Sequence, residues 1–211
     1  MTNLSDWESQ FEAWLTTKDT GDAAHGLDHV KRVVANAKRL AGASDANLSV
    51  VVPAAWLHDC VSVAKDSDLR SQASALAAKE AREFLASADY PDQWLDAIAH
   101  AIESHSFSAG IHPETLEAKI VQDADRLDAL GAIGIARCLQ TGTAMGSVLY
   151  FSDDPFADDR VADDGVSTID HFYTKLLTLA DTMQTEAGRS EANRRTEFMQ
   201  QYLQQLRREI E

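Results

Sequence analysis

The sequence predicts an all-α protein, and three observations support this prediction. Most segments repeat apolar residues at three- and four-residue steps, the spacing typical of amphipathic helices. Glycine and proline are scarce, at 10 and 4 of 211 residues, which suits helices better than a turn-rich β-sandwich. No segment alternates polar and apolar residues well enough to predict a strand. We therefore expect a single helical bundle domain over residues 1–211, with its core at about 20–185 and a C-terminal packing helix at about 189–210.

The first two helices are predicted from apolar periodicity and from their end residues. Residues 4–18 place large apolar side chains on one helical face. Ser5 precedes Glu8 by three positions, which predicts a capping box at the start of this helix. The segment 26–42 repeats the pattern and ends at Gly42, a residue type that commonly follows a helix.

The third segment, residues 46–60, is apolar all round and predicts a central helix. Pro53 lies inside it and either kinks the helix or marks its first turn. Residues 112–142 predict one long helix, or two helices that meet near Gly131 or Gly134. Further helical patterns occupy residues 67–87, 91–106, 166–185 and 190–211.

Charge limits the partners that this protein can have. Its 34 acidic and 19 basic residues give a formal net charge of −15. Such a surface repels nucleic-acid backbones and anionic lipids, so we expect neither nucleic acid polymers nor membranes as partners. A small anionic substrate remains compatible, because a bound metal ion can reverse the local potential. Cys60 and Cys138 lie in no CxxC pattern and predict buried thiols rather than a disulfide framework.

The chain ends and one long non-helical stretch bear on location and assembly. The N-terminal residues lack the basic and apolar regions of a signal peptide, and no run approaches the roughly 18–20 apolar residues of a membrane span. We therefore expect a cytoplasmic protein. The amphipathic C-terminal segment permits a homodimer. The acidic stretch 145–167 has no helical period, so it is either an exposed loop or the lid or rim of a pocket.

Four ionisable residues stand in otherwise apolar helical contexts: His29, the adjacent pair His58 and Asp59, and Asp125. Any one of them alone is better explained as a hydrogen-bonded core or boundary residue. Together, two imidazoles and two carboxylates can fill part of an octahedral shell around Mn²⁺, Fe²⁺ or Mg²⁺. They could also hold Zn²⁺, although four protein ligands in a tetrahedron would close that site to chemistry. A divalent ion would also explain why carboxylates occur in such apolar surroundings.

These residues also carry a resemblance to a known family. The order "HGLDH" (25–29), "AWLHDC" (55–60) and "VQDADRLDALG" (121–131) resembles the H…HD…D signature of the HD-domain superfamily of metal-dependent phosphohydrolases. The flanking stretches "DAAHGLDHVKRV", "HSFSAG" and "DHFYTKLL" are similar to the small bacterial HD hydrolases of the YedJ and YpgQ type. The resemblance extends over roughly residues 7–185.

The resemblance implies a specific site and reaction. It implies an all-α bundle in which one divalent metal ion is held by His29, His58, Asp59 and Asp125, with an "ADxL" context that selects Asp125 over Asp123 and Asp128. Mn²⁺ is favoured, and Mg²⁺, Fe²⁺, Ni²⁺, Co²⁺ and Zn²⁺ are compatible. The substrate would be a small phosphorylated metabolite, in the first place a nucleotide. For this subgroup the implied reaction is nucleoside triphosphate pyrophosphohydrolysis, which converts a (d)NTP to a (d)NMP and pyrophosphate.

The groups that would act beside the metal are less well defined. Many HD nucleotidases carry a Glu a few residues after the HD pair, whereas this chain reads "HDCVSVAKD", so Asp59 is the candidate base. Lys65 and His105 are candidates for neutralising phosphate charge, although a histidine at a helix C-terminus is also favoured by the helix dipole. Weaker substrate-binding candidates are His25, which could instead support a ligand, and the pair His171 and Lys175, one helical turn apart.

Other functions remain open from the sequence. A nucleotide phosphomonoesterase would use the same ligands. The missing Glu favours a non-catalytic, metal-stabilised regulatory or binding module. An oxygenase would need further His or carboxylate ligands for a second iron.

Overall fold

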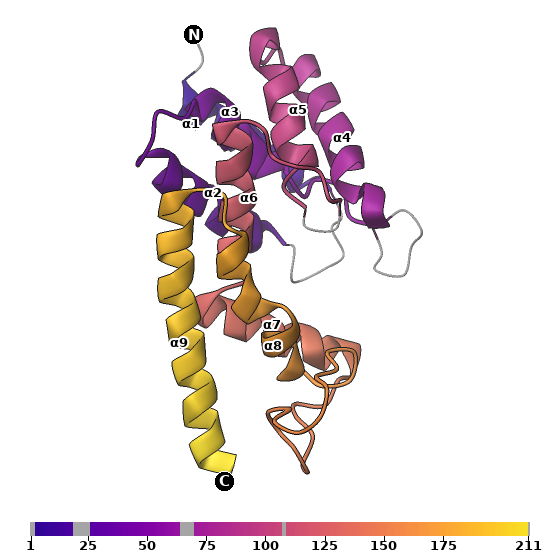
Figure 1. The fold of residues 1–211 in the computed structure, drawn as a ribbon. Helices are drawn as coiled ribbons and strands as arrows, with labels where there is room; N and C mark the ends of the chain where they lie inside the picture. Colours follow the sequence, from indigo (N-terminus) through magenta and orange to yellow (C-terminus); the bar gives the residue numbers. More distant parts are fainter. Residues whose placement is uncertain (1–2, 19–25, 64–69, 107–108, 211) are drawn as a thin grey trace. The chain divides into compact units, whose positions relative to one another are not determined.

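The computed structural model describes residues 3–18, 26–63, 70–106 and 109–210, with the side chain of residue 70 left out (Figure 1). Over these ranges the chain forms nine α-helices and three short 3-10 helices, and its β structure is limited to an isolated bridge between Val148 and Ser167. The all-α prediction is confirmed. The chain divides into two compact units, Met1–Asp125 and Arg126–Glu211. No helix in the described ranges is long and apolar enough to cross a bilayer.

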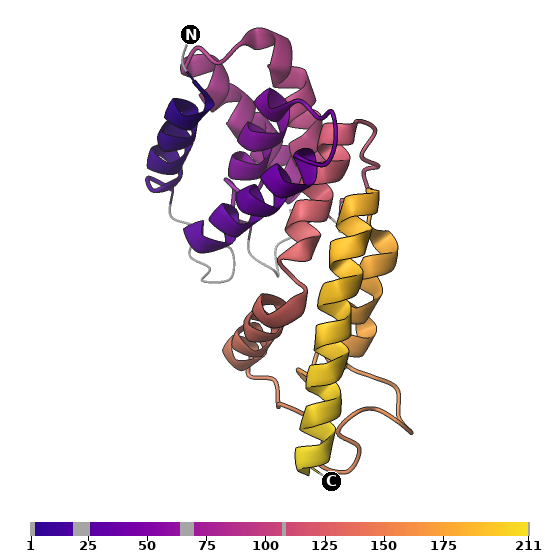
Figure 2. The same ribbon diagram turned by 90° about the vertical axis from the view of Figure 1, so that its left-hand side faces the viewer.

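The first unit is built around helix α3 (Leu48–Leu57). The side chains from Val50 to Leu57 are all buried, as expected for a helix that is apolar all round. Helices α1, α2 and α5 pack against α3, and α4 lies beside α5 (Figures 1 and 2). The other helices of this unit are α1 (Leu4–Leu15), α2 (Leu27–Ala41), α4 (Ala73–Ser87), α5 (Leu95–Glu103) and α6 (Leu116–Leu127), whose last turn crosses the unit boundary. Two 3-10 helices lie at Arg70–Gln72 and Asp92–Trp94.

The start of α1 differs from the predicted capping box. Asn3, not Ser5, is the N-cap, and its side chain accepts a hydrogen bond from the Asp6 N–H at 2.9 Å while Asp6 reciprocates. Asn caps a helix as well as Ser does, so the helix begins earlier than the predicted motif. Glu8 instead contacts Lys38, at 2.6 Å, and the indole N–H of Trp56, at 3.1 Å.

Pro53 lies in the interior of α3 and not in its first turn. Proline has no N–H, so the Ser49 carbonyl, four residues earlier, loses its ordinary helical donor. The Tyr90 hydroxyl donates to this carbonyl at 2.7 Å. A tyrosine from the turn after α4 therefore supplies the hydrogen bond that the proline removes.

We expect Tyr90→Phe to lower the free energy of unfolding by about 1–2 kcal/mol, because it leaves the partly buried Ser49 carbonyl without its donor. Urea titration would measure this, with Tyr202→Phe on the C-terminal helix as the matched hydroxyl deletion. In a Pro53→Ala background the N–H of residue 53 can again donate to the Ser49 carbonyl. There Tyr90→Phe should lower the free energy of unfolding by less than in the wild type. An equal cost in both backgrounds would contradict this role of Tyr90.

The second unit contains α7 (Gly131–Met145), α8 (Asp170–Thr174), a 3-10 helix (Leu176–Thr182) and α9 (Glu186–Ile210). Of the two alternatives for residues 112–142, two helices is correct, and they meet at Gly131, whose φ of +72° lies in the left-handed region. The expected helix over 166–185 is wrong in part, because regular α-helix stops at Thr174. The Thr178 and Thr182 hydroxyls donate to carbonyls three residues earlier, a competition that disfavours regular α-helix.

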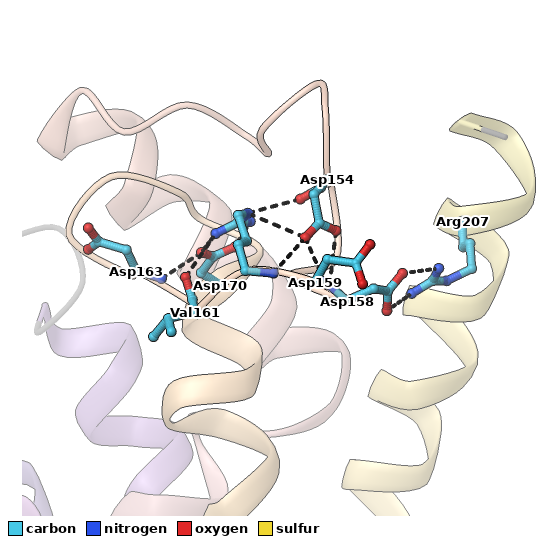
Figure 3. A network of polar contacts seen from close by, with 8 residues as sticks. Asp154, Asp158, Asp159, Val161, Asp163, Asp170 and Arg207 are labelled. Carbon is cyan, nitrogen blue, oxygen red and sulfur yellow. Dashed lines mark hydrogen bonds and ion pairs between the residues drawn. The ribbon is translucent and has the colours of Figure 1, made fainter.

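The acidic stretch 145–167 forms a loop that polar contacts tie to helices of its own unit (Figure 3). The carboxylate of Asp170, on α8, is fully buried and accepts hydrogen bonds from Arg160 Nη2 at 2.7 Å and from the Asp163 N–H at 2.6 Å. Near the loop tip, Asp158 pairs with Arg207 of α9 at 2.7 Å. The loop is therefore held in one conformation by charge-assisted hydrogen bonds.

Asp170→Asn should loosen this loop. The Arg160 guanidinium and the Asp163 N–H hold the pKa of Asp170 below its usual value, even though burial raises it. A depressed pKa stabilises the fold above the unfolded-state value of about 3.9 and loses that effect as the pH falls through the folded value. At neutral pH we expect at least about threefold faster protease cleavage within residues 145–167 and a lower melting temperature. The difference in melting temperature between variant and wild type should shrink below about pH 4. A pH-independent difference would contradict this assignment.

Candidate metal centre

Four predicted ligands converge within the first unit. His29 lies in the first turn of α2, His58 follows the last residue of α3, Asp59 comes next, and Asp125 lies in the last turn of α6. Both imidazoles are buried, at 2% and 0% exposed, whereas the two carboxylates keep about a quarter of their surface accessible. The cluster is therefore closed on the histidine side and open on the carboxylate side.

The distances between donor atoms suit a shared cation. The two Nε2 atoms of His29 and His58 lie 3.3 Å apart, and His29 Nε2 lies 3.4 Å from Asp125 Oδ1. Asp59 Oδ2 lies 3.6 Å from His58 Nε2 and 3.8 Å from His29 Nε2. Ligands about 2.1 Å from one ion are about 3 Å apart when adjacent in an octahedron and about 4.2 Å apart when opposite. The separations among His29, His58 and Asp125 fall in this range, so these three donors fit a single divalent ion, while Asp59 is grouped with His58 and His105.

Hydrogen bonding prepares His58 to be a ligand. Its Nδ1 lies 2.8 Å from the Ala55 carbonyl, an arrangement in which Nδ1–H donates and the lone pair of Nε2 faces the cluster. Burial lowers the pKa of His58 to about 4, against the opposing effect of the Asp59 charge. The imidazole is therefore neutral near pH 7, which is the protonation state that metal binding requires.

Asn36 ties α2 to α6 and was not predicted from the sequence. Asn36 lies two turns after His29 on the same buried face of α2, and its Nδ2 donates to the Ala124 carbonyl at 3.2 Å. Ala124 directly precedes Asp125, so this hydrogen bond holds in register the two helices that carry the predicted ligands His29 and Asp125. A polar residue among the buried apolar positions of α2 was the available signal in the sequence.

His105 lies beside the cluster, in the turn that follows α5. Its Nε2 is 3.5 Å from Asp59 Oδ1, and its Nδ1 is 2.6 Å from the Ile102 carbonyl. Although burial lowers the pKa of this imidazole, the hydrogen bond and negative charge of Asp59 raise it above the ordinary value. Asp59 thus turns one oxygen toward His29 and His58, the two predicted ligand histidines, and the other toward His105. His58, Asp59 and His105 form a second donor group that overlaps the first.

Comparison with known proteins places the chain in a family. The family model described as "HD domain" matches residues 26–130. The uncharacterized protein YpgQ of Bacillus subtilis is 33% identical over 206 residues, which cover 95% of this chain and 92% of YpgQ. The chain belongs to the HD-domain family.

Two solved structures extend the likeness of this HD-domain protein over nearly its full length. The crystal structure of Bacillus subtilis YpgQ in complex with ADP has a TM-score of 0.75 and 35% identity, covering 95% of this chain and 93% of that one. An HD-superfamily hydrolase from Bacillus thuringiensis has a TM-score of 0.74 and 30% identity, covering 97% of both chains. The predicted family is confirmed.

The remaining predicted residues of this HD-domain protein fall outside the described residues or in the second unit. His25 and Lys65 fall outside the described residues. His171 and Lys175 belong to the second unit, where His171 Nδ1 contacts Asp164 at 2.8 Å, and their part in substrate binding stays a prediction. Within the described residues Asp128 pairs with Arg137 at 2.8 Å and belongs to neither donor group.

Proposed function

We propose that this chain is a divalent-metal-dependent phosphohydrolase that converts a nucleoside triphosphate and water to a nucleoside monophosphate and pyrophosphate. The observation that carries this proposal is the convergence of His29, His58 and Asp125 donor atoms beside Asp59 in a member of the HD-domain family. The ADP bound to the YpgQ relative supports a nucleotide as the substrate class.

We propose that the four ligands hold one ion, with Mn²⁺ favoured by the mixed imidazole and carboxylate donors. When bound, such an ion polarises phosphoryl oxygens and acidifies water. Asp59 Oδ1 points away from the ligand histidines and toward His105, so this oxygen can accept a proton from water. This assignment gives the chain a base without the Glu that many HD nucleotidases carry.

His105 has a different role in this proposal. With its pKa raised by Asp59, a protonated imidazole can offset charge that develops on the departing pyrophosphate and can donate a proton to it. Lys65, His25, His171 and Lys175 are retained as proposed phosphate-binding residues, on the strength of their positions in the sequence.

Product chromatography after incubation with Mn²⁺ and a panel of nucleotides tests the proposed bond. Equal amounts of nucleoside monophosphate and pyrophosphate are the expected products. Inorganic phosphate without pyrophosphate would reject cleavage between the α and β phosphates and favour the phosphomonoesterase alternative. Metal retention with no hydrolysis of any phosphoester would instead favour a binding module.

A further inference from the structure

Gln122 is a buried polar residue to which the proposed reaction assigns no role. It lies on α6 one helical turn before Asp125, and its side chain is almost fully enclosed, at 2% exposed. A glutamine in such a position must satisfy a donor and an acceptor that an apolar residue would not bring into the core.

The amide of Gln122 reaches the end of α5. Its Nε2 donates to the Ser104 carbonyl at 2.6 Å. Ser104 is the C-cap of α5 and is fully buried, so this carbonyl is one of those that a helix leaves without an internal partner. Among the described residues no group donates to Gln122 Oε1. The Gln122 side chain therefore supplies a donor to the last turn of α5, while its own Oε1 accepts no hydrogen bond from the described residues.

The residue after Ser104 is His105, and its imidazole depends on the geometry of the same turn. The Ile102 carbonyl lies 2.6 Å from Nδ1 of His105 and also accepts the His105 backbone N–H at 3.4 Å. This arrangement keeps the proton on Nδ1 of the neutral ring and directs Nε2 to Asp59. A rotation of the Ser104–His105 peptide would move the Ser104 carbonyl away from Gln122 and turn His105 Nε2 away from Asp59.

We propose that Gln122 is a positioning residue for His105: by holding the Ser104 carbonyl, it fixes the turn that presents His105 Nε2 to Asp59. Gln122 and Asp125 share one helix, so α6 sets both the metal ligand and the placement of His105. The activity readout of this inference rests on the proposed function, whereas its spectroscopic readout does not.

Gln122→Met is the main test, because methionine has nearly the same length but no donor. Long-range ¹H–¹⁵N NMR of the metal-free protein at about pH 9, where imidazoles are neutral, reports which ring nitrogen carries the proton. We expect His105 to change from one Nδ1–H tautomer in the wild type to a mixture in the variant. Gln10→Met, an exposed substitution on α1, is the matched control and should leave the His105 signals unchanged.

Activity distinguishes positioning from a merely structural role. We expect Gln122→Met to bind metal normally and to unfold near the wild-type temperature, since removal of the unpaired oxygen offsets the loss of the donor to Ser104, yet to lose about 10–100-fold in kcat with little change in KM. In a His105→Ala background, Gln122→Met should lower kcat by less than about twofold, because the imidazole through which Gln122 acts is absent.

Each outcome bears on one proposal. Unchanged His105 tautomers in Gln122→Met, or an undiminished effect in the His105→Ala background, would overturn the role of Gln122. If Gln122→Met fails to fold, Gln122→Leu, which is smaller and also cannot donate to the carbonyl, gives the same NMR test. A changed tautomer in a protein without any hydrolase activity would support the placement by Gln122 while rejecting the proposed function.

Discussion

Asp125→Ala should abolish metal binding and lower turnover by more than about 100-fold, because losing a ligand costs more than losing a group that only orients one. Asp125 is the contribution of α6 to a cluster in which His29 Nε2 lies 3.4 Å from its Oδ1. The remaining two imidazoles and one carboxylate would leave the ion incompletely held. Metal analysis after dialysis measures the first effect, and pyrophosphate release measures the second.

Thermal unfolding gives a check that does not depend on activity. A ligand at 100 times its Kd stabilises the folded state by about 2.7 kcal/mol, so added Mn²⁺ should raise the melting temperature of the wild type. Asp125→Ala should show no such rise. Asp45→Ala, an exposed substitution before α3, is the matched control and should keep both metal and the thermal response. Metal content in Asp125→Ala equal to that of the wild type would reject the site.

His105→Ala should have the second-largest effect: a fall in kcat of about 10²–10⁴-fold with metal content unchanged. The Nε2 atom of this imidazole lies 3.5 Å from Asp59, and His105 is not a member of the His29–His58–Asp125 group, so we expect it to act on protons and phosphate charge rather than on the ion. His105→Gln keeps a hydrogen-bond donor but carries no charge, so it should recover only part of the loss. Side-by-side kcat, KM and metal analysis on the three proteins separates these effects.

The control for this prediction is His112→Ala, which removes an exposed imidazole from the loop before α6 and should leave kcat and metal content as in the wild type. If His105→Ala loses metal together with activity, His105 is a ligand and the group formed with His58 and Asp59 holds the ion. Wild-type kcat in His105→Ala would remove His105 from the mechanism altogether.

The sequence was most informative where the physical signal is local. Apolar spacing over residues 26–42 and the apolar run before His58 predict helices, because a helix buries side chains at three- and four-residue steps. The left-handed turn at Gly131 was among the positions expected for a helix break, because glycine adopts a positive φ without strain. The break after Thr174 was not predicted, because hydroxyl competition for backbone carbonyls leaves the apolar spacing unchanged.

For the candidate site, the sequence alone determined the donor types, and through the family resemblance it predicted a ligand set. Only the tertiary structure decided how these donors come together and which side chains hold the backbone around them by hydrogen bonds. Asn36 reaches the Ala124 carbonyl, Gln122 reaches the Ser104 carbonyl and Tyr90 reaches the Ser49 carbonyl. Each of these bonds joins a side chain to a backbone group at least 18 residues away. The bond depends on which helices pack together, and periodicity along a single helix carries no information about that packing.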